Sequence, residues 1–388
     1  MSGKSVCYYT MGHPLVSRRV GGAEIQLYLI GKELQRLGWQ THYLVDDEGQ
    51  PETIVRKGQI LHKVRTFKRS LWDLVEAAPF FALNSFLTYS HPFFTRVLNS
   101  FKADIYHQRG SNIATGYFAH HAKKNARPFV FSIAHIDDCT LSGNMWRGFF
   151  RNTIKKRLYL YGLKNANVII ATAEYLRKAM AQCMPNADIR IIPSGHPVPK
   201  SLPKKSDPPF AVWVGRTADY KFPMQFIELA QKFPHYKFVM VGAIQEKDIM
   251  GKTYNIFAKT LELAKKTENV EILPFQSLEK VNAIIARASV LVDTSDSAGF
   301  PNTFIQAWLR KTPVVSLNVD PDEVLCKEKI GFHAKGDFNK LIETTRMLLE
   351  DTKLNRKIGT RAFAYARKHH DIRMTAKKHH ELYRELIE

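Results

Sequence analysis

Strand-length apolar runs alternate with helix-length segments in this chain, and this alternation constrains the fold more than any other feature. Residues 6–10 form the first apolar run, and the glycine pair Gly21-Gly22 then precedes helical periodicity over residues 24–37. A second apolar run at residues 40–45 completes a strand, helix, strand order. This order predicts a parallel sheet, because a crossover helix returns the chain to the same end of the sheet.

The alternation occurs twice. Further strands of the first stretch are expected at 104–108, 129–134, 168–172 and 190–192. A linker at residues 193–209, rich in Pro, Lys and Ser, predicts a domain boundary. Beyond it we expect strands at 210–214, 237–241, 270–273, 290–293 and 314–317, helices at 223–233, 254–267, 278–286 and 303–309, and a mostly helical end from 338 to 388. A chain of 388 residues exceeds one ordinary core, so two α/β domains are predicted.

The charge balance is strongly basic. Lys and Arg number 57 against 36 Asp and Glu, a formal net charge of +21. Residues 1–200 hold 27 basic and 13 acidic residues, a charge of +14, so the excess lies mainly in the first half. Anionic lipid, a diphosphate substrate and nucleic acid all fit this charge. The sequence contains no recognisable nucleic-acid-binding module, so we expect no nucleic-acid partner.

Cysteine usage and hydropathy give expectations about compartment and metal binding. The four cysteines are too sparse for a disulfide framework and lack paired ligand spacing. Three histidine doublets are expected at the surface, because neighbours on a helix point in different directions; these are His120-His121, His369-His370 and His379-His380. We therefore expect no metal. With no signal-peptide pattern and no membrane-spanning run, a cytoplasmic protein is predicted.

Three segments carry candidate chemistry for an anionic ligand. Gly21 and Gly22 open a helix, where main-chain N–H groups can meet a phosphate, although a tight turn explains two glycines equally well. Arg216 and Lys221 follow the strand at 210–214 in the segment VGRTADYK. Two cations at this spacing suit a diphosphate, whose charge they would neutralise in place of Mg²⁺. A Gly299-Phe300-Pro301 turn after the strand at 290–293 leads into a further helix start.

Taken in order, these motifs resemble a known family. GGAE near the start, VGRxxxxK after the linker, and GFPNTFIQAW followed by PVVSL are similar to the retaining glycosyltransferases of family 4, which have the GT-B fold. The resemblance implies two Rossmann-like domains with parallel sheets that face each other across a cleft. It implies an acceptor-side domain at 1–195, a nucleotide-sugar-binding domain at 196–365, and a helical segment at 366–388 that packs back on the first domain.

The resemblance also implies an activity. The chain would transfer a sugar from a UDP- or GDP-linked donor, with retention of configuration and without a metal. The acceptor would be a saccharide or a polyprenyl-diphosphate-linked saccharide, in bacterial surface polysaccharide biosynthesis.

The family's site residues carry over by position. His135, Arg216 and Lys221 are the expected catalytic residues, with His135 against the reacting sugar. Phe275 would line the base pocket. The full expected donor set is Gly21, Gly22, Arg216, Lys221, Phe275, Gly299, Phe300, Pro301, Asn302, Thr303 and Gln306.

This chain departs from the family at two glutamates. Ala298 stands where the family has the glutamate that contacts the donor sugar, and Gln306 stands where it has the glutamate that binds the ribose. The Gln306 amide can still hydrogen-bond a ribose hydroxyl, whereas Ala298 cannot contact a sugar hydroxyl in this way. Asp296 is a candidate substitute for the first glutamate.

Residues near two strand ends of the first stretch are acceptor candidates. His107 and Arg109 lie in DIYHQRGS at the end of the strand expected at 104–108, and Asp137 follows two residues after His135. Asp137 and Asp138 can orient an acceptor hydroxyl or cap the next helix.

Two basic segments indicate an anionic membrane surface as a partner. Residues 67–102 combine basic residues with nine aromatics: Phe67, Trp72, Phe80, Phe81, Phe86, Tyr89, Phe93, Phe94 and Phe101. Residues 147–164 carry six basic residues, and there is no acidic residue between Cys139 and Ala173. Such segments suit peripheral association with the inner face of the cell membrane, although many of the aromatics must belong to the core.

Three alternatives stay open. A non-catalytic sugar-nucleotide-binding protein of the same fold would explain Ala298. A sugar-nucleotide epimerase of GT-B architecture would convert the donor without an acceptor. A nucleic-acid-binding protein would explain the charge of +21 but not two Rossmann-like units.

Overall fold

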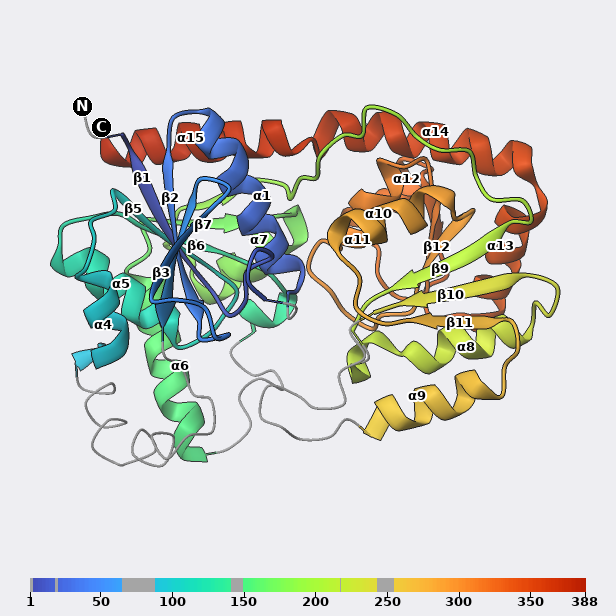
Figure 1. The fold of residues 1–388 in the computed structure, drawn as a ribbon, viewed down its shortest axis with the longest axis horizontal. Coiled ribbons are helices and arrows are strands. Elements are labelled where there is room, and N and C mark those ends of the chain that lie inside the picture. The colour runs from blue at the N-terminus through green and yellow to red at the C-terminus, as the bar shows by residue number, and fades with distance from the viewer. Residues whose placement is uncertain (1–2, 18–19, 65–87, 141–148, 217, 243–254) are drawn as a thin grey trace. The chain divides into compact units, whose positions relative to one another are not determined.

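The structure is a computed structural model that describes residues 3–17, 20–64, 88–140, 149–216, 218–242 and 255–388. The chain forms two compact units, each built from a sheet and helices (Figure 1). Unit 1 comprises Met1–Gly195 and Ile372–Glu388, and unit 2 comprises His196–Asp371. The prediction of two parallel-sheet α/β domains is confirmed.

In the described part of unit 1, the sheet has the order β3-β4-β2-β1-β5-β6-β7-β8. Its strands are β1 (Ser5–Thr10), β2 (Gln40–Asp46), β3 (Thr53–Arg56), β4 (Gln59–Val64), β5 (Ile105–Arg109), β6 (Phe129–Ser132), β7 (Val168–Ala171) and β8 (Ile189–Ile191). All pairings are parallel except that of the edge strand β3 with β4. Every residue of β1, β6 and β7 is buried, as expected for parallel strands covered on both faces.

Helices connect these strands. The described helices of unit 1 are α1 (Gly22–Arg36), α4 (Pro92–Leu98), α5 (Ala114–Lys124), the 3₁₀ turn η1 (Ile136–Asp138), α6 (Phe149–Lys164), α7 (Glu174–Cys183) and α15 (Ile372–Ile387).

The last helix of the chain is part of unit 1. α15 lies beside α1, as Figure 1 shows. Its Tyr383 is fully buried, with its hydroxyl 3.3 Å from the hydroxyl of Tyr8 and 2.5 Å from Nδ1 of His107. The indole Nε1 of Trp39 donates to Nδ1 of His380 at 2.9 Å. Aromatic packing with hydrogen-bonded polar tips therefore fixes α15 on this unit.

Unit 2 has an all-parallel sheet of order β11-β10-β9-β12-β13-β14 among its described residues. Its strands are β9 (Phe210–Val214), β10 (Lys237–Val241), β11 (Val270–Leu273), β12 (Val290–Asp293), β13 (Val314–Ser316) and β14 (Gly331–His333). Its helices are η3 (Asp219–Lys221), α8 (Pro223–Gln231), α9 (Asn255–Lys265), α10 (Leu278–Arg287), α11 (Asn302–Trp308), η4 (Pro321–Glu323), α12 (Val324–Lys327), α13 (Phe338–Glu350) and α14 (Thr352–His369). Trp213 and Trp308 are the largest buried side chains of its two apolar clusters.

The predicted strands agree with the structure to within two residues at each end, but several elements were not predicted. The hairpin of β3 and β4 and the short strand β14 were missed; β3 and β14 are edge strands, which stay unpaired on one side. α4, α5, α7 and α12 were also not predicted.

The prediction that the histidine doublets lie at the surface is wrong for one member of each pair. His121, His370 and His379 are buried, at 8%, 2% and 1% exposure. His121 lies 3.1 Å from the hydroxyl of Tyr106, and Nδ1 of His379 lies 2.8 Å from the carbonyl of Thr375. Neighbouring helix positions do point in different directions, but one of those directions here is the core.

Part of the basic, aromatic segment is described. Phe94 is buried, Phe101 stacks on two histidines, and the Tyr89 ring stacks on Tyr161. These aromatics are therefore packed within unit 1. Some aromatic and basic residues of the two segments lie outside the described residues. These are Phe67, Lys68, Arg69, Trp72, Phe80, Phe81, Phe86 and Arg147.

Within the described residues, no helix has both the length and the apolar character required to span a bilayer.

The stacked pair His42 and His62 makes unit 1 sensitive to acid. Nδ1 of His42 lies 3.0 Å from Nε2 of His62, and both rings stack on Phe101. Burial lowers the pKa of His42 to about 4, and burial together with the neighbouring His42 lowers the pKa of His62 to about 4. Both rings are therefore neutral in the folded chain at pH 7.

We predict that the free energy of unfolding falls as the pH decreases from 6.5 toward 4. Because the unfolded chain binds protons at the ordinary histidine pKa of about 6.5, stability is fully present above that pH and is lost below it. Urea denaturation at pH 7 and pH 5 measures the difference. The double variant His42→Gln with His62→Gln should show a smaller pH dependence, and the exposed control His235→Gln an unchanged one; an unchanged dependence in the double variant would contradict the assignment.

Candidate functional site

The carboxyl edge of each sheet collects the candidate residues of that unit. Parallel strands all end at the same edge, so the loops after them lie next to one another. In unit 2 these are the loops after β9, β11 and β12, and in unit 1 those after β1, β5 and β6. Each edge is described below by itself.

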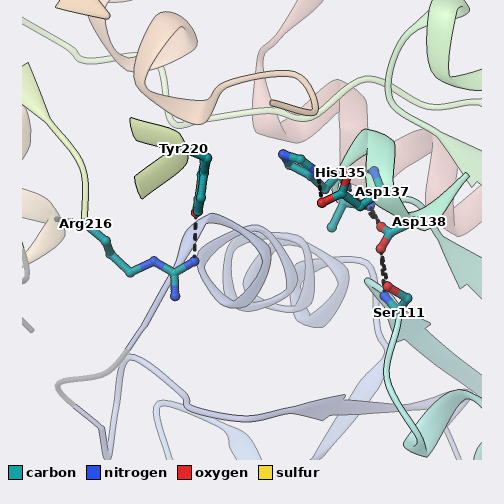
Figure 2. Close-up of polar contacts among 7 residues, drawn as sticks. Ser111, His135, Asp137, Asp138, Arg216 and Tyr220 are labelled. Carbon is teal, nitrogen blue, oxygen red and sulfur yellow. Dashed lines mark hydrogen bonds and ion pairs between the residues drawn. The ribbon is translucent and has the colours of Figure 1, made fainter. Parts of the chain in front are cut away.

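Two cations contact Tyr220 in unit 2. Nη2 of Arg216 donates to the hydroxyl of Tyr220 at 3.2 Å, as Figure 2 shows, and the Arg216 side chain is exposed. Nζ of Lys221 lies 5.4 Å from the centre of the Tyr220 ring. The structure thus places both predicted cations in one loop beyond β9, each in contact with Tyr220.

A buried carboxylate positions Lys221. Oδ1 of Asp293 accepts from the hydroxyl of Ser295 at 2.7 Å, and the hydroxyl oxygen of Ser295 accepts from Nζ of Lys221 at 3.0 Å. Asp293 and Ser295 are 6% and 0% exposed. A charge-assisted chain of this kind holds the ammonium in one place.

The main chain of the cation loop is tied to the end of β12. The hydroxyl of Thr294 donates to the carbonyls of Lys221 and Phe222, at 2.8 and 3.0 Å, and accepts from the Trp213 indole at 3.1 Å. The main-chain N–H of Asp296 donates to the carbonyl of Tyr220 at 2.8 Å. Phe222 has a φ of 43°, a strained value for a residue other than glycine, and these contacts hold it there.

The other predicted donor residues of unit 2 lie around α11. Gly299 and Pro301 are buried, Thr303 is half-buried, and Oδ1 of Asn302 lies 3.3 Å from Nε2 of His196. The Phe300 ring packs against Trp308 and His370. Gln306 is only 4% exposed, so little of its amide reaches the surface.

Phe275 lies in the loop between β11 and α10 and is 37% exposed. Large aromatic side chains with this much exposure are suited to stacking on a planar ligand. Its place beyond a strand end puts it at the same sheet edge as Arg216.

In unit 1, the Gly21-Gly22 loop already contacts a carboxylate of the protein itself. Gly21 is the N-cap of α1, and its main-chain N–H donates to Oε2 of Glu24 at 2.9 Å. A Cβ at Gly21 would lie 3.0 Å from the same oxygen. The Glu24 carboxylate therefore satisfies an N–H that we predicted for a phosphate, and its charge opposes a second anion at this helix end.

Asp138 fixes the loop that carries His135. One of its carboxylate oxygens accepts from the main-chain N–H groups of Ala134 and His135, at 2.7 and 3.0 Å. The other accepts from the N–H and hydroxyl of Ser111, at 3.0 and 2.5 Å, so the loops after β5 and β6 are joined (Figure 2). Asp138 is 3% exposed and fulfils the capping alternative of the sequence analysis.

His135 is held by its neighbour. The main-chain N–H of Asp137 donates to Nδ1 of His135 at 3.2 Å, and the Asp137 carboxylate lies 3.3 Å from the same nitrogen (Figure 2). The side chains of His135 and Asp137 are 28% and 44% exposed. Both predicted residues therefore lie at an accessible part of the sheet edge.

Arg109 is the last residue of β5 and lies near two acidic residues, Asp138 and Glu24. Burial lowers its pKa to about 10, while Asp138 and Glu24 oppose that shift, so the guanidinium stays charged at neutral pH. Nη2 donates to the hydroxyl of Ser194 at 3.2 Å. Within the described residues, Nε is buried and has no hydrogen-bond partner.

His107 lies in the core of unit 1. It is 0% exposed, its Nδ1 faces the hydroxyl of Tyr383, and its Nε2 lies 2.6 Å from the hydroxyl of Ser132. Burial, with the nearby His379 and Arg109, lowers the pKa of His107 well below its usual range. Both ring nitrogens have partners inside the unit, so we do not carry forward the acceptor role predicted for His107.

The sequence analysis did not single out Tyr220, Asp293, Ser295 or Glu24. Asp293 had a detectable signal, because a carboxylate at the end of an otherwise apolar strand needs buried partners. Ser295, two residues later, is such a partner.

Comparisons with known proteins agree with this organisation. The family described as "Glycosyl transferases group 1" matches residues 197–365, and "Glycosyltransferase Family 4" matches residues 20–198. Among curated proteins, none matches the sequence.

Three solved structures illustrate the shared fold. Sucrose-phosphate synthase from Thermosynechococcus elongatus has a TM-score of 0.76 at 17% identity, with 99% of each chain covered. HepE from Anabaena, solved with UDP and glucose, has a TM-score of 0.72 at 17% identity, covering 97% of this chain and 98% of that one. A glycosyltransferase from Rickettsia africae has a TM-score of 0.67 at 16% identity, with both chains fully covered.

We predict that Asp138→Asn lowers the free energy of unfolding by about 2 kcal/mol or more. The amide NH₂ cannot accept from two of the donors that the carboxylate now satisfies, and each unsatisfied buried donor costs about 1–3 kcal/mol. Asp137→Asn is the matched control, because its side chain is 44% exposed and should change stability by less than about 0.5 kcal/mol. Urea denaturation of both variants measures the effect, and equal stabilities would contradict the assigned role of Asp138.

Proposed function

Because this chain belongs to the family 4 glycosyltransferases, which have the GT-B fold, we propose that it transfers a sugar from a UDP- or GDP-linked donor to a saccharide or lipid-linked saccharide. We place the reaction among the retaining transfers. The observation that carries the proposal is the pair Arg216 and Lys221, two cations in one fixed loop at the carboxyl edge of a parallel sheet.

The pair suits a diphosphate leaving group. Arg216 offers a planar set of N–H donors and Lys221 a compact charge, and together they neutralise the charge that develops as the bond to the sugar breaks. Because Asp293 and Ser295 hold the ammonium of Lys221, this half of the site needs little reorganisation during the reaction. In this proposal no metal ion is needed at the diphosphate.

The transfer step follows from this electrostatic role. The sugar–oxygen bond to the diphosphate breaks, the acceptor hydroxyl attacks the same face of the sugar, and a phosphate oxygen of the leaving group takes the hydroxyl proton. His135 orients the sugar by hydrogen bonding, and the hydrogen bonds of Asp138 keep its loop fixed. Positioning and charge stabilisation therefore carry the catalysis.

On the nucleotide, Phe275 stacks with the base and Gln306 contacts the ribose. HepE has been solved with UDP and with UDP-glucose, so UDP-sugars are the first donors to test. Gly299 to Thr303 form the turn beside the diphosphate, and the Gly21-Gly22 loop contributes to the donor side through shape rather than charge, given the Glu24 carboxylate already there.

On the acceptor, Arg109 and Asp137 provide an anion-binding and a hydroxyl-binding group. The buried Nε of Arg109 supports a phosphate-bearing acceptor such as a polyprenyl-diphosphate-linked saccharide. Lys156, Arg157 and Lys164 are exposed on α6, where they can meet an anionic membrane surface. We therefore propose peripheral association with the inner face of the cell membrane and a role in bacterial surface polysaccharide biosynthesis.

One alternative is favoured by a specific residue. Ala298 replaces the family glutamate that contacts the donor sugar, so a protein that binds the donor without transferring its sugar is the second candidate. Asp296 is exposed two residues earlier and is the proposed substitute in the catalytic reading.

A donor panel tests the proposal. Thermal melting with UDP, GDP and their sugars should show one nucleotide that raises the melting temperature, because a ligand that binds only the folded state stabilises it. Radiolabelled transfer to membrane extracts from the source bacterium then separates transfer from binding alone. Stabilisation without transfer or hydrolysis would favour the second candidate, and no stabilisation by any nucleotide would refute both.

We predict that Arg216→Ala lowers kcat about 10²- to 10³-fold, the cost typical of losing one group that stabilises transition-state charge. Arg216 is exposed, so the fold should survive, as circular dichroism can verify. Lys232→Ala removes another exposed cation of unit 2 and serves as the control with unchanged kcat. Near-normal turnover of Arg216→Ala would refute its role at the diphosphate.

A further inference from the structure

Three residues with metal-binding side chains gather near β13 and β14 of unit 2. Asp320 lies in the loop after β13, Cys326 in α12, and His333 at the end of β14. One ligand atom from each lies within 4.8 Å of the other two. In the described part of the chain, no other group of three such residues meets this criterion.

Asp320 has a buried carboxylate oxygen close to His333. Its side chain is 1% exposed, and its Oδ1 accepts from the main-chain N–H of Leu325 at 2.8 Å. Its Oδ2 is buried and has no hydrogen-bond partner among the residues that the structure describes, and Nδ1 of His333 is 3.9 Å away, beyond hydrogen-bond distance. A buried carboxylate oxygen without a donor is costly, and such exceptions need an explanation.

The other two side chains of the cluster also favour a bound cation. Nε2 of His333 is also buried and has no hydrogen-bond partner within the described part of the chain, and the His333 side chain is 18% exposed. The Cys326 residue is exposed, so a solvated ion can reach the cluster.

We propose that Asp320, Cys326 and His333 bind one zinc ion, with water as the fourth ligand. A carboxylate, a thiolate and an imidazole are all zinc ligands, whereas a thiolate disfavours Mg²⁺ and Ca²⁺. Zinc bonds of about 2.0–2.3 Å in a tetrahedron separate ligand atoms by about 3.3–3.8 Å, so shifts of about 1 Å complete the site.

Binding exchanges one proton for the metal. Zinc binds a thiolate, a carboxylate and a neutral imidazole, so the Cys326 thiol loses its proton to solvent as the sulfur–zinc bond forms. The ion ties α12 and the loop before it to the end of β14. Because β14 lies three strands from β9, about 14 Å at ordinary strand spacing, the ion acts on the stability of unit 2 and is separate from the diphosphate site proposed above.

Cobalt substitution tests the site. The full chain, without a polyhistidine tag, is stripped with a chelator and titrated with Co²⁺, whose visible absorption reports tetrahedral geometry and whose near-ultraviolet charge-transfer band reports a thiolate ligand. We expect one Co²⁺ per chain with both signals, displaced by Zn²⁺. Zn²⁺ in large excess over its Kd should also raise the melting temperature by several degrees.

Three variants sharpen the test. Cys326→Ser should abolish the thiolate band, and Asp320→Asn, which keeps an oxygen for the Leu325 N–H, should weaken affinity at least about tenfold. Cys183→Ser, in unit 1, is the matched control and should keep both signals. No stoichiometric Co²⁺ binding, or a thiolate band that survives Cys326→Ser, would overturn the proposal. Melting with nucleotides is read separately, so failure here leaves the proposed transfer untouched.

Discussion

A buried carboxylate at the carboxyl edge of each parallel sheet organises the functional loops of that unit. Asp293 in unit 2 acts through Ser295 on Lys221, and Asp138 in unit 1 joins the loop of His135 to that of Ser111. Each carboxylate is nearly inaccessible, so its hydrogen bonds form in a low-dielectric environment where they are strong and an unmade bond is costly. The loops are therefore preorganised by groups that need not touch a ligand.

The side chains of Lys221 and Arg216, the two proposed diphosphate-binding cations, are not held equally firmly. Lys221 has its ammonium fixed by Ser295, while Arg216 is exposed and contacts the hydroxyl of Tyr220. A fixed charge supplies stabilisation without reorganisation, whereas an exposed guanidinium can follow a ligand's oxygens as they move. Both side chains contact Tyr220, Arg216 at the hydroxyl and Lys221 at the ring.

At the carboxyl edge of the sheet in unit 1, acidic side chains compensate the positive charge of Arg109. Arg109 lies near Asp138 and Glu24, and Glu24 also occupies the N–H of Gly21. Despite the chain's net charge of +21, this part of the edge is locally compensated. The excess of positive charge is thus carried by exposed side chains, such as Lys156, Arg157 and Lys164 on α6, and is a property of the surface more than of the predicted site.

The sequence by itself determined the alternation of strands and helices and the loop position of Arg216 and Lys221. Those features depend on local periodicity and on the rule that parallel strands end at one edge. Only the tertiary structure decided that His107 is a core residue under Tyr383, that Ser295 holds Lys221, and that Asp320, Cys326 and His333 meet. These contacts join residues as far as 276 positions apart. No local pattern in the sequence encodes which distant side chain will be the hydrogen-bond partner of a buried polar group.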